Sequence, residues 1–380
     1  MSAVSILFHS ARKLDAHGQV DDFWMLVADG TITATGSGPQ HPAADESVDV
    51  GGHWLVPGFI DLHGHGGGGH AYDDSADDLR AALATHRSHG TTRSVVSLVA
   101  NPVDALVEQL GMIADVAAGD PLILGSHLEG PFLSPDNRGA HSPQHLLEPT
   151  PAVVERLLEA ARGTLRQLTL APELPNALEA VQVLVESGVA VGVGHTVADA
   201  DTAKRAFDAG ARILTHAFNA MPGIHHRAPG PVVAAFDDER VTLELILDGK
   251  HVHPRIAHLA FVQAPGRIAL VTDAMAAAGS ADGDYTLGDL TVAVRNGLAM
   301  LRGTTTIAGS TLTQDAALRM AVSEAGIAPV DAVAALTLTP ARALGIDDRH
   351  GLLAAGRAAD AVVLDHAWHV TQVWADGALL

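Results

Sequence analysis

The stretch that most restricts the fold of this chain is residues 56–69, where a short apolar run ends in histidines and glycines. The run, residues 54–62, is typical of a buried strand. His63 and His65 follow it. Because residues i and i+2 of an extended chain point to the same side, both imidazoles can reach one metal ion. The glycines then let the backbone turn away. A buried strand that presents such side chains at its carboxyl end is typical of a parallel α/β barrel.

A His-x-His pair is weak evidence by itself, because a chain with 22 histidines among 380 residues contains about one such pair by chance. A second pair, His251 and His253, illustrates this. An isolated pair more often consists of two solvated or core histidines. The strand end, the glycine-rich turn and the polar residues further along the chain are what favour a metal site here.

Length and composition fit one barrel-sized domain with a small second one. Hydrophobic residues make up 47% of the chain, and branched aliphatics prevail over aromatics, as in proteins of helices and parallel strands. The chain has no cysteine, which excludes disulfides and thiolate metal ligands. A net charge of -21 argues against nucleic acid and anionic membranes as partners. We find no secretory signal and no apolar run of membrane-spanning length, and expect a cytoplasmic protein.

The middle of the chain alternates between apolar runs and amphipathic stretches. Strands are expected to end near His63, Val99, Glu129, Glu173, His195, Asn219, Asp248 and Asp273. Helices are expected at residues 76–89, 103–118, 152–162 and 178–187. Eight strand–helix units predict a (β/α)8 barrel over residues 55–345.

Segments near the end of the barrel do not follow this alternation of strands and helices. We expect a Pro/Gly-rich functional loop at residues 221–233, an inserted β-hairpin at 285–302, and closing helices at 311–325 and 330–344.

Both ends of the chain are predicted to be β structure. Asp29-Gly30 and Asp376-Gly377 each lie beside strand-like runs, and Asp-Gly is a strong hairpin signal. We therefore expect one small β-sandwich domain built from residues 1–54 and 346–380.

Polar residues at the predicted strand ends form a consistent set: His63, His65, Glu129, His195, His216 and Asp273. Imidazole and carboxylate are the ligands that zinc and similar divalent ions take, and a bound metal can activate water. Each residue also has an ordinary interpretation, as a cap or as a hydrogen-bonded core residue. Their common position at one end of several strands favours a metal site.

Longer motifs carry a more specific signal: HLEGPF at 127–132, RGAH at 138–141, GHT at 194–196, THAFNAM at 215–221, LDGKH at 247–251, TDA at 272–274, IAGS at 307–310 and GRAADAVVLD at 356–365. With them the chain resembles the amidohydrolase superfamily over nearly its whole length. Within it, the chain is similar to the branch that removes acetate from N-acetylglucosamine 6-phosphate. The resemblance implies a metal-dependent hydrolase of a linear amide.

The resemblance also implies how metal is held. Many relatives bridge two ions with a carbamylated lysine, but Lys13, Lys204 and Lys250 are the only lysines here, and none ends the third or fourth strand. Glu129 would therefore be the residue that bridges the two ions. We expect one ion on Glu129, His195 and His216 and a second on His63, His65 and Glu129. Zinc is expected first, with iron, manganese, cobalt or cadmium as alternatives.

Substrate contacts follow from the same likeness. Asp273 would move protons and His251 would polarise the carbonyl. The resemblance places His141 and His251 along the sugar and acetamide, and Ala140, Ile307, Ala308 and Gly309 in the substrate pocket. It places Asn219 and the Ala220 amide on the phosphate, together with Arg227 from the partner subunit of a homodimer. Without the family, Arg227 would be a solvated loop arginine.

Two rival functions remain at this stage. One is another amidohydrolase that acts on an N-acyl amino acid or a cyclic amide. The other is a non-catalytic metal-binding or assembly protein that kept the barrel.

Overall fold

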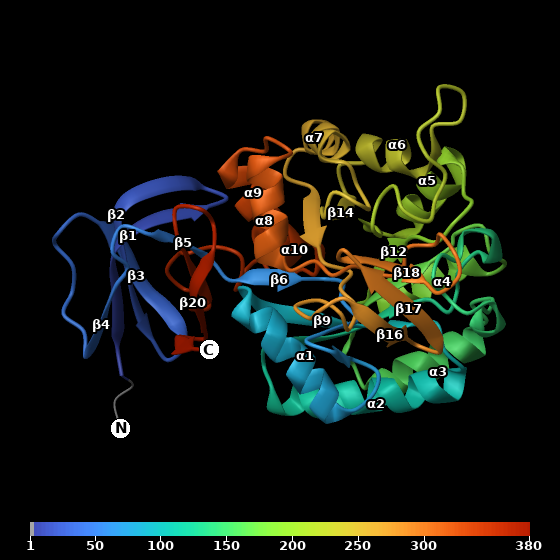
Figure 1. Ribbon diagram of the computed structural model, residues 1–380, viewed down its shortest axis with the longest axis horizontal. Helices are drawn as coiled ribbons and strands as arrows, with labels where there is room; N and C mark the ends of the chain where they lie inside the picture. Colours follow the sequence, from blue (N-terminus) through green and yellow to red (C-terminus); the bar gives the residue numbers. More distant parts are fainter. Residues whose placement is uncertain (1–3) are drawn as a thin grey trace.

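The computed structural model describes residues 4–380 and contains a parallel eight-stranded barrel beside a separate sheet made from both chain ends (Figure 1). The predicted (β/α)8 barrel with a second β domain is therefore confirmed. Residues 1–3, the start of the predicted small domain, lie outside the described residues. Within residues 4–380, none of the helices has the length and apolar character needed to cross a membrane.

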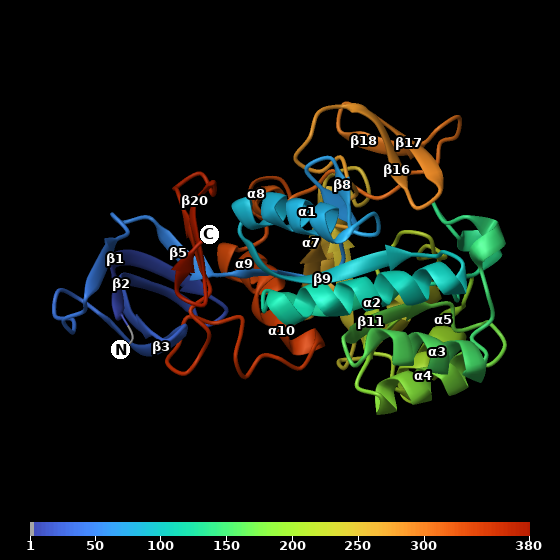
Figure 2. The same ribbon diagram turned by 90° about the horizontal axis from the view of Figure 1, so that it is seen from below.

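The barrel strands follow one another in chain order around the sheet. They are β6 (Phe59–Asp61), β9 (Thr91–Val99), β10 (Ile123–Glu129), β11 (Leu165–Leu170), β12 (Ala190–Val193), β13 (Ile213–Leu214), β14 (Thr242–Ile246) and β15 (Ile268–Val271). The helices around them are α1 (Ala76–Ser88), α2 (Val103–Gly119), α3 (Pro151–Ala161), α4 (Ala177–Glu186), α5 (Ala200–Ala209), α6 (Gly230–Asp237), α7 (Pro254–Gln263), α8 (Gln314–Ser323), α9 (Pro329–Leu336) and α10 (Leu338–Ala343). Figure 2 shows α1 to α4 along one side of the barrel.

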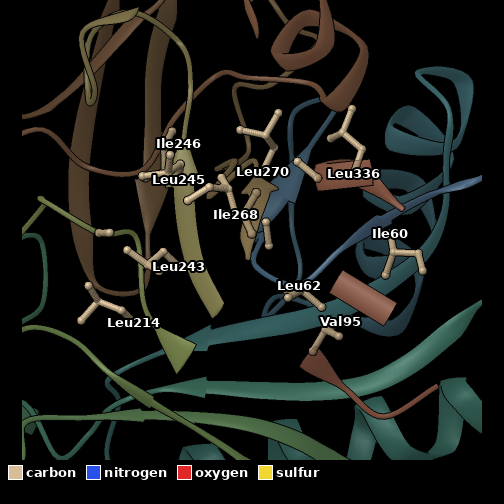
Figure 3. Close-up of a cluster of buried hydrophobic side chains, with 14 of the residues drawn as sticks. Ile60, Leu62, Val95, Leu214, Leu243, Leu245, Ile246, Ile268, Leu270 and Leu336 are labelled. Atoms are coloured by element: carbon tan, nitrogen blue, oxygen red, sulfur yellow. The ribbon is translucent and has the colours of Figure 1, made fainter. Parts of the chain in front are cut away.

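Apolar side chains pack between the strands and the helices. In Figure 3, Leu214, Leu243, Leu245, Ile268 and Leu270 of neighbouring strands gather in one buried cluster with Leu336 of α9. Because side chains alternate along a strand, the residue between two of these outward-facing side chains, such as Leu243 and Leu245, points into the barrel. In β14 that residue is a glutamate, so the barrel interior below the strand ends is partly polar.

The barrel closes where its first and last strands meet. Gly64 and Ala274 form a parallel bridge just beyond the ends of β6 and β15. The buried carboxylate of Asp61 accepts a hydrogen bond from the Thr272 hydroxyl at 2.6 Å across the same seam. Burial raises the pKa of Asp61.

Lower in the seam, one side-chain amide links the two strands. Gln314 Nε2 donates to the carbonyl of Ile60 at 2.9 Å and to that of Leu270 at 3.4 Å, and its Oε1 accepts from the Thr91 hydroxyl. Gln314, at the start of α8, thus supplies hydrogen bonds that a strand ladder would otherwise make.

The second sheet has its own apolar core. Its strands are β1 (Ile6–Asp15), β2 (Gly18–Ala28), β3 (Thr31–Ser37), β4 (Glu46–Asp49), β5 (Trp54–Pro57), β19 (Ala361–Leu364), β20 (Val370–Ala375) and β21 (Ala378–Leu379). The order is β21-β20-β19-β5-β1-β2-β3, with β4 beside β1. Both predicted Asp-Gly turns have positive φ at both residues, as a tight hairpin requires. Phe8, Met25, Leu55 and Val363 share the core.

Shorter elements complete the chain. β7 (Gly66–Gly67) and β8 (His70–Ala71) form a small ribbon, η1 (Pro135–Asn137) and η2 (Pro143–His145) are single 3₁₀ turns, and β16 (Gly283–Leu287), β17 (Leu290–Arg295) and β18 (Leu298–Leu301) form a three-stranded sheet.

The expectations for the end of the barrel need three corrections. The predicted hairpin at 285–302 is three strands, because a second turn precedes β17. The predicted loop at 221–233 ends earlier, since α6 starts at Gly230. The predicted helix at 330–344 is interrupted at Thr337, whose backbone leaves the helical region (φ -132°, ψ -80°).

A buried ion-pair group joins the two domains. Arg93 of β9 donates to both carboxylate oxygens of Asp360 at 2.7 and 2.9 Å, and to Asp376 at 2.7 Å. Burial alone would raise the pKa of Asp360, but hydrogen bonds from His350 and Arg93 lower it to about 2. Bidentate geometry and burial make this group far stronger than a surface ion pair.

We predict that Arg93→Met lowers the free energy of unfolding by about 3–5 kcal/mol, because Asp360 loses its buried partner. Chemical unfolding at pH 7 measures this. The control is Arg80→Met, whose pair with Asp77 is exposed and should change stability by less than about 1 kcal/mol.

The contribution of the Arg93–Asp360 pair to the free energy of unfolding should depend on pH, and the direction follows from the pKa of Asp360. The folded-state pKa of Asp360 is lowered, so its contribution is present above the unfolded pKa, about 4, and is lost as pH falls towards 2. The stability difference between the parent and Arg93→Met should shrink over that range. A difference that stays constant would contradict the assignment.

Candidate metal centre and active-site cavity

The polar residues singled out in the sequence come together at the carboxyl ends of the barrel strands. Glu129 is the last residue of β10, and the others follow the ends of β6, β12, β13 and β15: His63, His65, His195, His216 and Asp273. All six are buried. Parallel strands direct their carboxyl ends to one mouth of a barrel, so residues far apart in the chain converge there.

Glu129 lies at the centre of the cluster. Its Oε1 is 3.0 Å from His195 Nε2 and 2.9 Å from His216 Nε2. The two Nε2 atoms are 2.9 Å apart. Three ligand-type atoms therefore face one small volume.

A second group shares Glu129. Its Oε2 is 3.1 Å from His65 Nε2, which is also 3.1 Å from His63 Nε2. Asp273 Oδ1 lies 3.2 Å from His65 Nε2 and 3.6 Å from His63 Nε2. One ligand atom from each of these four residues falls within 4.8 Å of the others.

Hydrogen bonds on the far side of two rings decide which nitrogen is free. His195 Nδ1 is 3.0 Å from the carbonyl of Asn137, so it carries the proton and Nε2 keeps a lone pair for a metal. His141 is different. Its Nδ1 accepts from the Ala100 N–H at 3.2 Å, so the proton is on Nε2, 3.4 Å from Glu129. His141 is therefore a hydrogen-bond donor and not a ligand.

The electrostatics of the cluster are strongly coupled. Burial disfavours the charged form of Glu129, but the surrounding imidazoles, His63 first, hold the pKa of that carboxyl well below its usual range. Burial also opposes protonation of His65, yet Asp273 and Glu129 raise the pKa of that imidazole to about 9. The pKa of Asp273 is lowered despite burial, chiefly by the charge on His63. The site thus gathers positive charge around two ionised carboxylates.

This donor set fits a divalent cation. Imidazole nitrogen and carboxylate oxygen are its preferred protein ligands, and a cation can replace protons on His63 and His65. Three of the predicted residues, His195, His216 and Asp273, have φ of 46°, 30° and 46°. Left-handed backbone is uncommon for residues other than glycine, although Asp and His adopt it more readily than most, and it is often found at functional sites.

A cavity of about 440 Å³ lies above the cluster. Most of the predicted substrate residues line it: Ala140, His141, Asn219, Ala220, His251, Ile307 and Gly309. Leu287 and Thr306, from the three-stranded sheet and the loop after it, also form part of its wall. The volume suits a small molecule the size of a sugar.

Two predicted contacts are not part of the wall. Ala308 is fully buried in the apolar core below β16–β18, so its side chain points away from the cavity. Arg227 lies exposed in the loop before α6, where it contacts His226. In the described chain, Arg138 is the one arginine or lysine that lines the cavity.

His251 is held by an acidic partner. Its Nδ1 lies 2.8 Å from Asp248 Oδ2, and the other oxygen of Asp248 accepts from the His251 N–H. Burial would raise the pKa of Asp248, but His251 lowers it. The Asp248 carboxylate therefore fixes the orientation of the His251 ring, which lines the cavity.

Apart from His127, which follows from its position two residues before Glu129 on the same strand, sequence reasoning missed the polar layer beneath the cluster. Ser97, His127, Thr169 and Thr215 form a chain of side-chain hydrogen bonds of 2.8 to 2.9 Å inside the barrel. Glu244 lies beside it. Its signal in the sequence is a charged residue between two leucines in an otherwise apolar strand.

Comparisons with known proteins agree with this geometry. The model of the amidohydrolase family matches residues 54–380. The chain is 39% identical to the N-acetylgalactosamine-6-phosphate deacetylase of Escherichia coli O157:H7 over 98% of both chains. It is 37% identical to the human N-acetylglucosamine-6-phosphate deacetylase, over 90% of this chain and 87% of that one.

Comparison with solved structures also finds similarity to deacetylases of phosphorylated N-acetylhexosamines. An N-acetyl-D-glucosamine-6-phosphate deacetylase variant from Mycobacterium smegmatis, in complex with N-acetyl-D-glucosamine 6-phosphate, superimposes with a TM-score of 0.94 at 41% identity. The match covers 100% of this chain and 99% of that chain. The N-acetylglucosamine-6-phosphate deacetylase of Thermotoga maritima matches with a TM-score of 0.89 at 29% identity, over 98% and 99% of the two chains.

We predict that divalent metal stabilises the folded chain through Glu129. Adding Zn²⁺ at about 100 times its Kd should contribute about 2.7 kcal/mol and raise Tm, and a chelator should reverse this. Glu129→Gln should lose most of the metal-dependent shift.

The matched control is Glu148→Gln, since Glu148 is exposed. It should keep the full shift in thermal melts. A Glu129→Gln protein with the parent's metal response would remove Glu129 from the site.

Proposed function

The chain belongs to the amidohydrolase family, and we propose that it removes acetate from N-acetyl-D-glucosamine 6-phosphate to give D-glucosamine 6-phosphate. The observation that carries this proposal is the buried group of Glu129 with four imidazoles and Asp273 at the bottom of a sugar-sized cavity. Near-full-length similarity to deacetylases of phosphorylated N-acetylhexosamines supports it.

One cation would be held by Glu129, His195 and His216, and a second by His63, His65 and Glu129. Zinc suits this mixed nitrogen and oxygen set, and iron, manganese, cobalt and cadmium are alternatives. Such a cation supplies a Lewis acid that polarises the acetamide carbonyl and acidifies the attacking water.

Asp273 is the proton carrier in this proposal. Its lowered pKa keeps the carboxylate ionised at neutral pH, ready to accept a proton from the attacking water. The same carboxyl group then donates that proton to the departing amine nitrogen. Attack forms a C–O bond, and collapse breaks the C–N bond and releases acetate.

Histidines on the cavity wall orient the substrate. His251, which Asp248 orients through Nδ1, would polarise the carbonyl oxygen as negative charge develops there. His141 presents an N–H at Nε2 and would contact the sugar. Ala140, Asn219, Ala220, Ile307 and Gly309 would surround the ring and the phosphate.

The phosphate contact depends on assembly. We place Arg227 on the phosphate in the neighbouring subunit of a homodimer, because it is exposed on a loop and outside its own cavity wall. A guanidinium binds phosphate well through paired donors. A phosphorylated substrate favours a cytoplasmic location.

The C4 epimer of the substrate is a second candidate. The similarity to the E. coli O157:H7 relative, named for N-acetylgalactosamine 6-phosphate, favours it. The two sugars differ in the orientation of one hydroxyl, which the same mechanism tolerates. Relative kcat/KM on the two phosphorylated sugars separates them.

The proposal predicts acetate release from N-acetylglucosamine 6-phosphate by metal-loaded protein. Asp273→Asn should fold and bind metal but lose at least about 100-fold in kcat, because general acid–base catalysis contributes this much. Acetate release, metal analysis and thermal melting are measured on the same preparations. N-acetyl amino acids, cyclic amides and the galacto epimer complete the panel.

Two results would contradict this reading. Near-parental turnover by Asp273→Asn would remove Asp273 from proton transfer. Faster hydrolysis of an N-acetyl amino acid or a cyclic amide would replace the substrate class.

For the phosphate, we predict that Arg227→Ala raises KM for the phosphorylated sugar and changes hydrolysis of N-acetylglucosamine little. Arg138→Ala is the comparison, since that guanidinium lines the cavity of its own chain. A selective loss in Arg138→Ala alone would move phosphate recognition to Arg138.

Mixing variants tests the partner's role. Arg227→Ala and Asp273→Asn chains, dissociated and reassembled together, should recover up to about a quarter of the parental rate, because mixed dimers contain one intact site. No recovery in mixed dimers verified by mass would place Arg227 in its own subunit's site or outside both.

A further inference from the structure

Glu244, in the middle of β14, is a fully buried carboxylate that the proposed reaction leaves unused. Its Oε1 accepts a hydrogen bond from Gln167 Nε2 at 2.7 Å. Its Oε2 lies 3.4 Å from His63 Nδ1 and 3.4 Å from the His216 backbone N–H. The carboxylate therefore sits inside the barrel directly beneath the metal cluster.

Packing alone does not account for a glutamate at this position. The interior of a (β/α)8 barrel is normally filled by branched aliphatic side chains. A buried carboxylate is costly unless it is paired, and among residues 4–380 neither lysine nor arginine forms an ion pair with Glu244. Its compensation comes from Gln167 and His63.

The direction of these hydrogen bonds limits the state of His63. A carboxylate only accepts, so His63 Nδ1 must carry the proton that faces Glu244. The lone pair is then on Nε2, which lies 3.1 Å from His65 Nε2 and 3.4 Å from Glu129 Oε1. This is the form of the ring that can bind a cation.

We propose that Glu244 is a positioning residue for a second metal ion: it fixes His63 with the proton on Nδ1, and Gln167 holds the carboxylate in that orientation. The inference rests on the proposed metal site. It goes beyond it by naming what makes the position formed by His63, His65 and Glu129 able to bind.

Removing the acceptor tests this role. In Glu244→Met the His63 Nδ1–H has no acceptor beneath it, so the ring can carry its proton on Nε2, where it blocks the metal. The double variant Gln167→Glu/Glu244→Gln keeps an acceptor: the carboxylate at position 167 accepts from the new amide NH₂, so the amide oxygen must face His63 Nδ1.

The experiment titrates chelator-treated protein with Zn²⁺ alone and counts bound metal per chain by elemental analysis after dialysis. We expect two ions in the parent. Glu244→Met should keep the first ion and lose about 10- to 100-fold in affinity for the second. The double variant should bind both ions as the parent does. Glu148→Met, the same substitution at an exposed position, should also match the parent.

A fallback variant covers a failure of Glu244→Met to fold. Gln167→Met removes the donor that holds Glu244 but leaves the contact with His63. It should weaken the second ion by a smaller factor and leave the first unchanged. An unchanged affinity for the second ion in this variant would overturn the proposal.

Other outcomes are equally decisive. Parental affinity for two ions in Glu244→Met, or loss of the second ion in the double variant, would overturn the role of Glu244, as would a single ion in the parent. Acetate release is measured separately. Two ions with the expected losses but no deacetylase activity would end the proposed function and leave this inference intact.

Discussion

The structure depends on keeping the Glu129 carboxylate ionised in a place almost hidden from water. Imidazoles from three other strand ends surround it, and each charge makes the opposite charge beside it tolerable. No single strand supplies this compensation. It exists only when the barrel is closed, which explains why the seam between β6 and β15 is secured by buried side chains, Asp61 and Gln314. If β6 and β15 separated, His63 and Asp273 would move apart, and Glu129 would lose some of the imidazoles that compensate its charge.

The strand ends do more than place the site residues: they also impose an unusual backbone conformation on three of them. His195, His216 and Asp273 all leave the extended conformation for the left-handed region at the residue whose side chain enters the cluster. Such a conformation costs on the order of 1–3 kcal/mol for a residue with a side chain, so the surrounding barrel must hold it. Below them, the hydrogen-bonded layer that includes His127 and Thr169 fills a space where aliphatic side chains would otherwise lie. These side-chain hydrogen bonds hold the rings in place.

The sequence predicts the parts of this architecture that leave a local pattern. Apolar runs that end in His63, Glu129 or Asp273 reveal both the strands and the mouth of the barrel, because one strand end is a local event. The partners of those residues are not local. Glu244 binds a ring 181 positions away and looks like an ordinary strand residue in the sequence. Ala308 belongs to a motif that was expected to line the cavity, yet its side chain packs in the apolar core below β16–β18. The motif sets the path of the backbone, but the residues of the additional strand determine what surrounds this side chain.

The pairing of β5 with β19 has a consequence for biosynthesis. Leu55 lies opposite Val363, more than 300 positions later, so one edge of β5 stays unpaired until the ribosome has made the residues between them and β19 itself. At about 5–20 residues per second, that delay amounts to tens of seconds. An open strand edge can recruit other chains during that interval. The nascent protein therefore carries a risk of self-association at the free edge of β5, and the translation of β19 removes it.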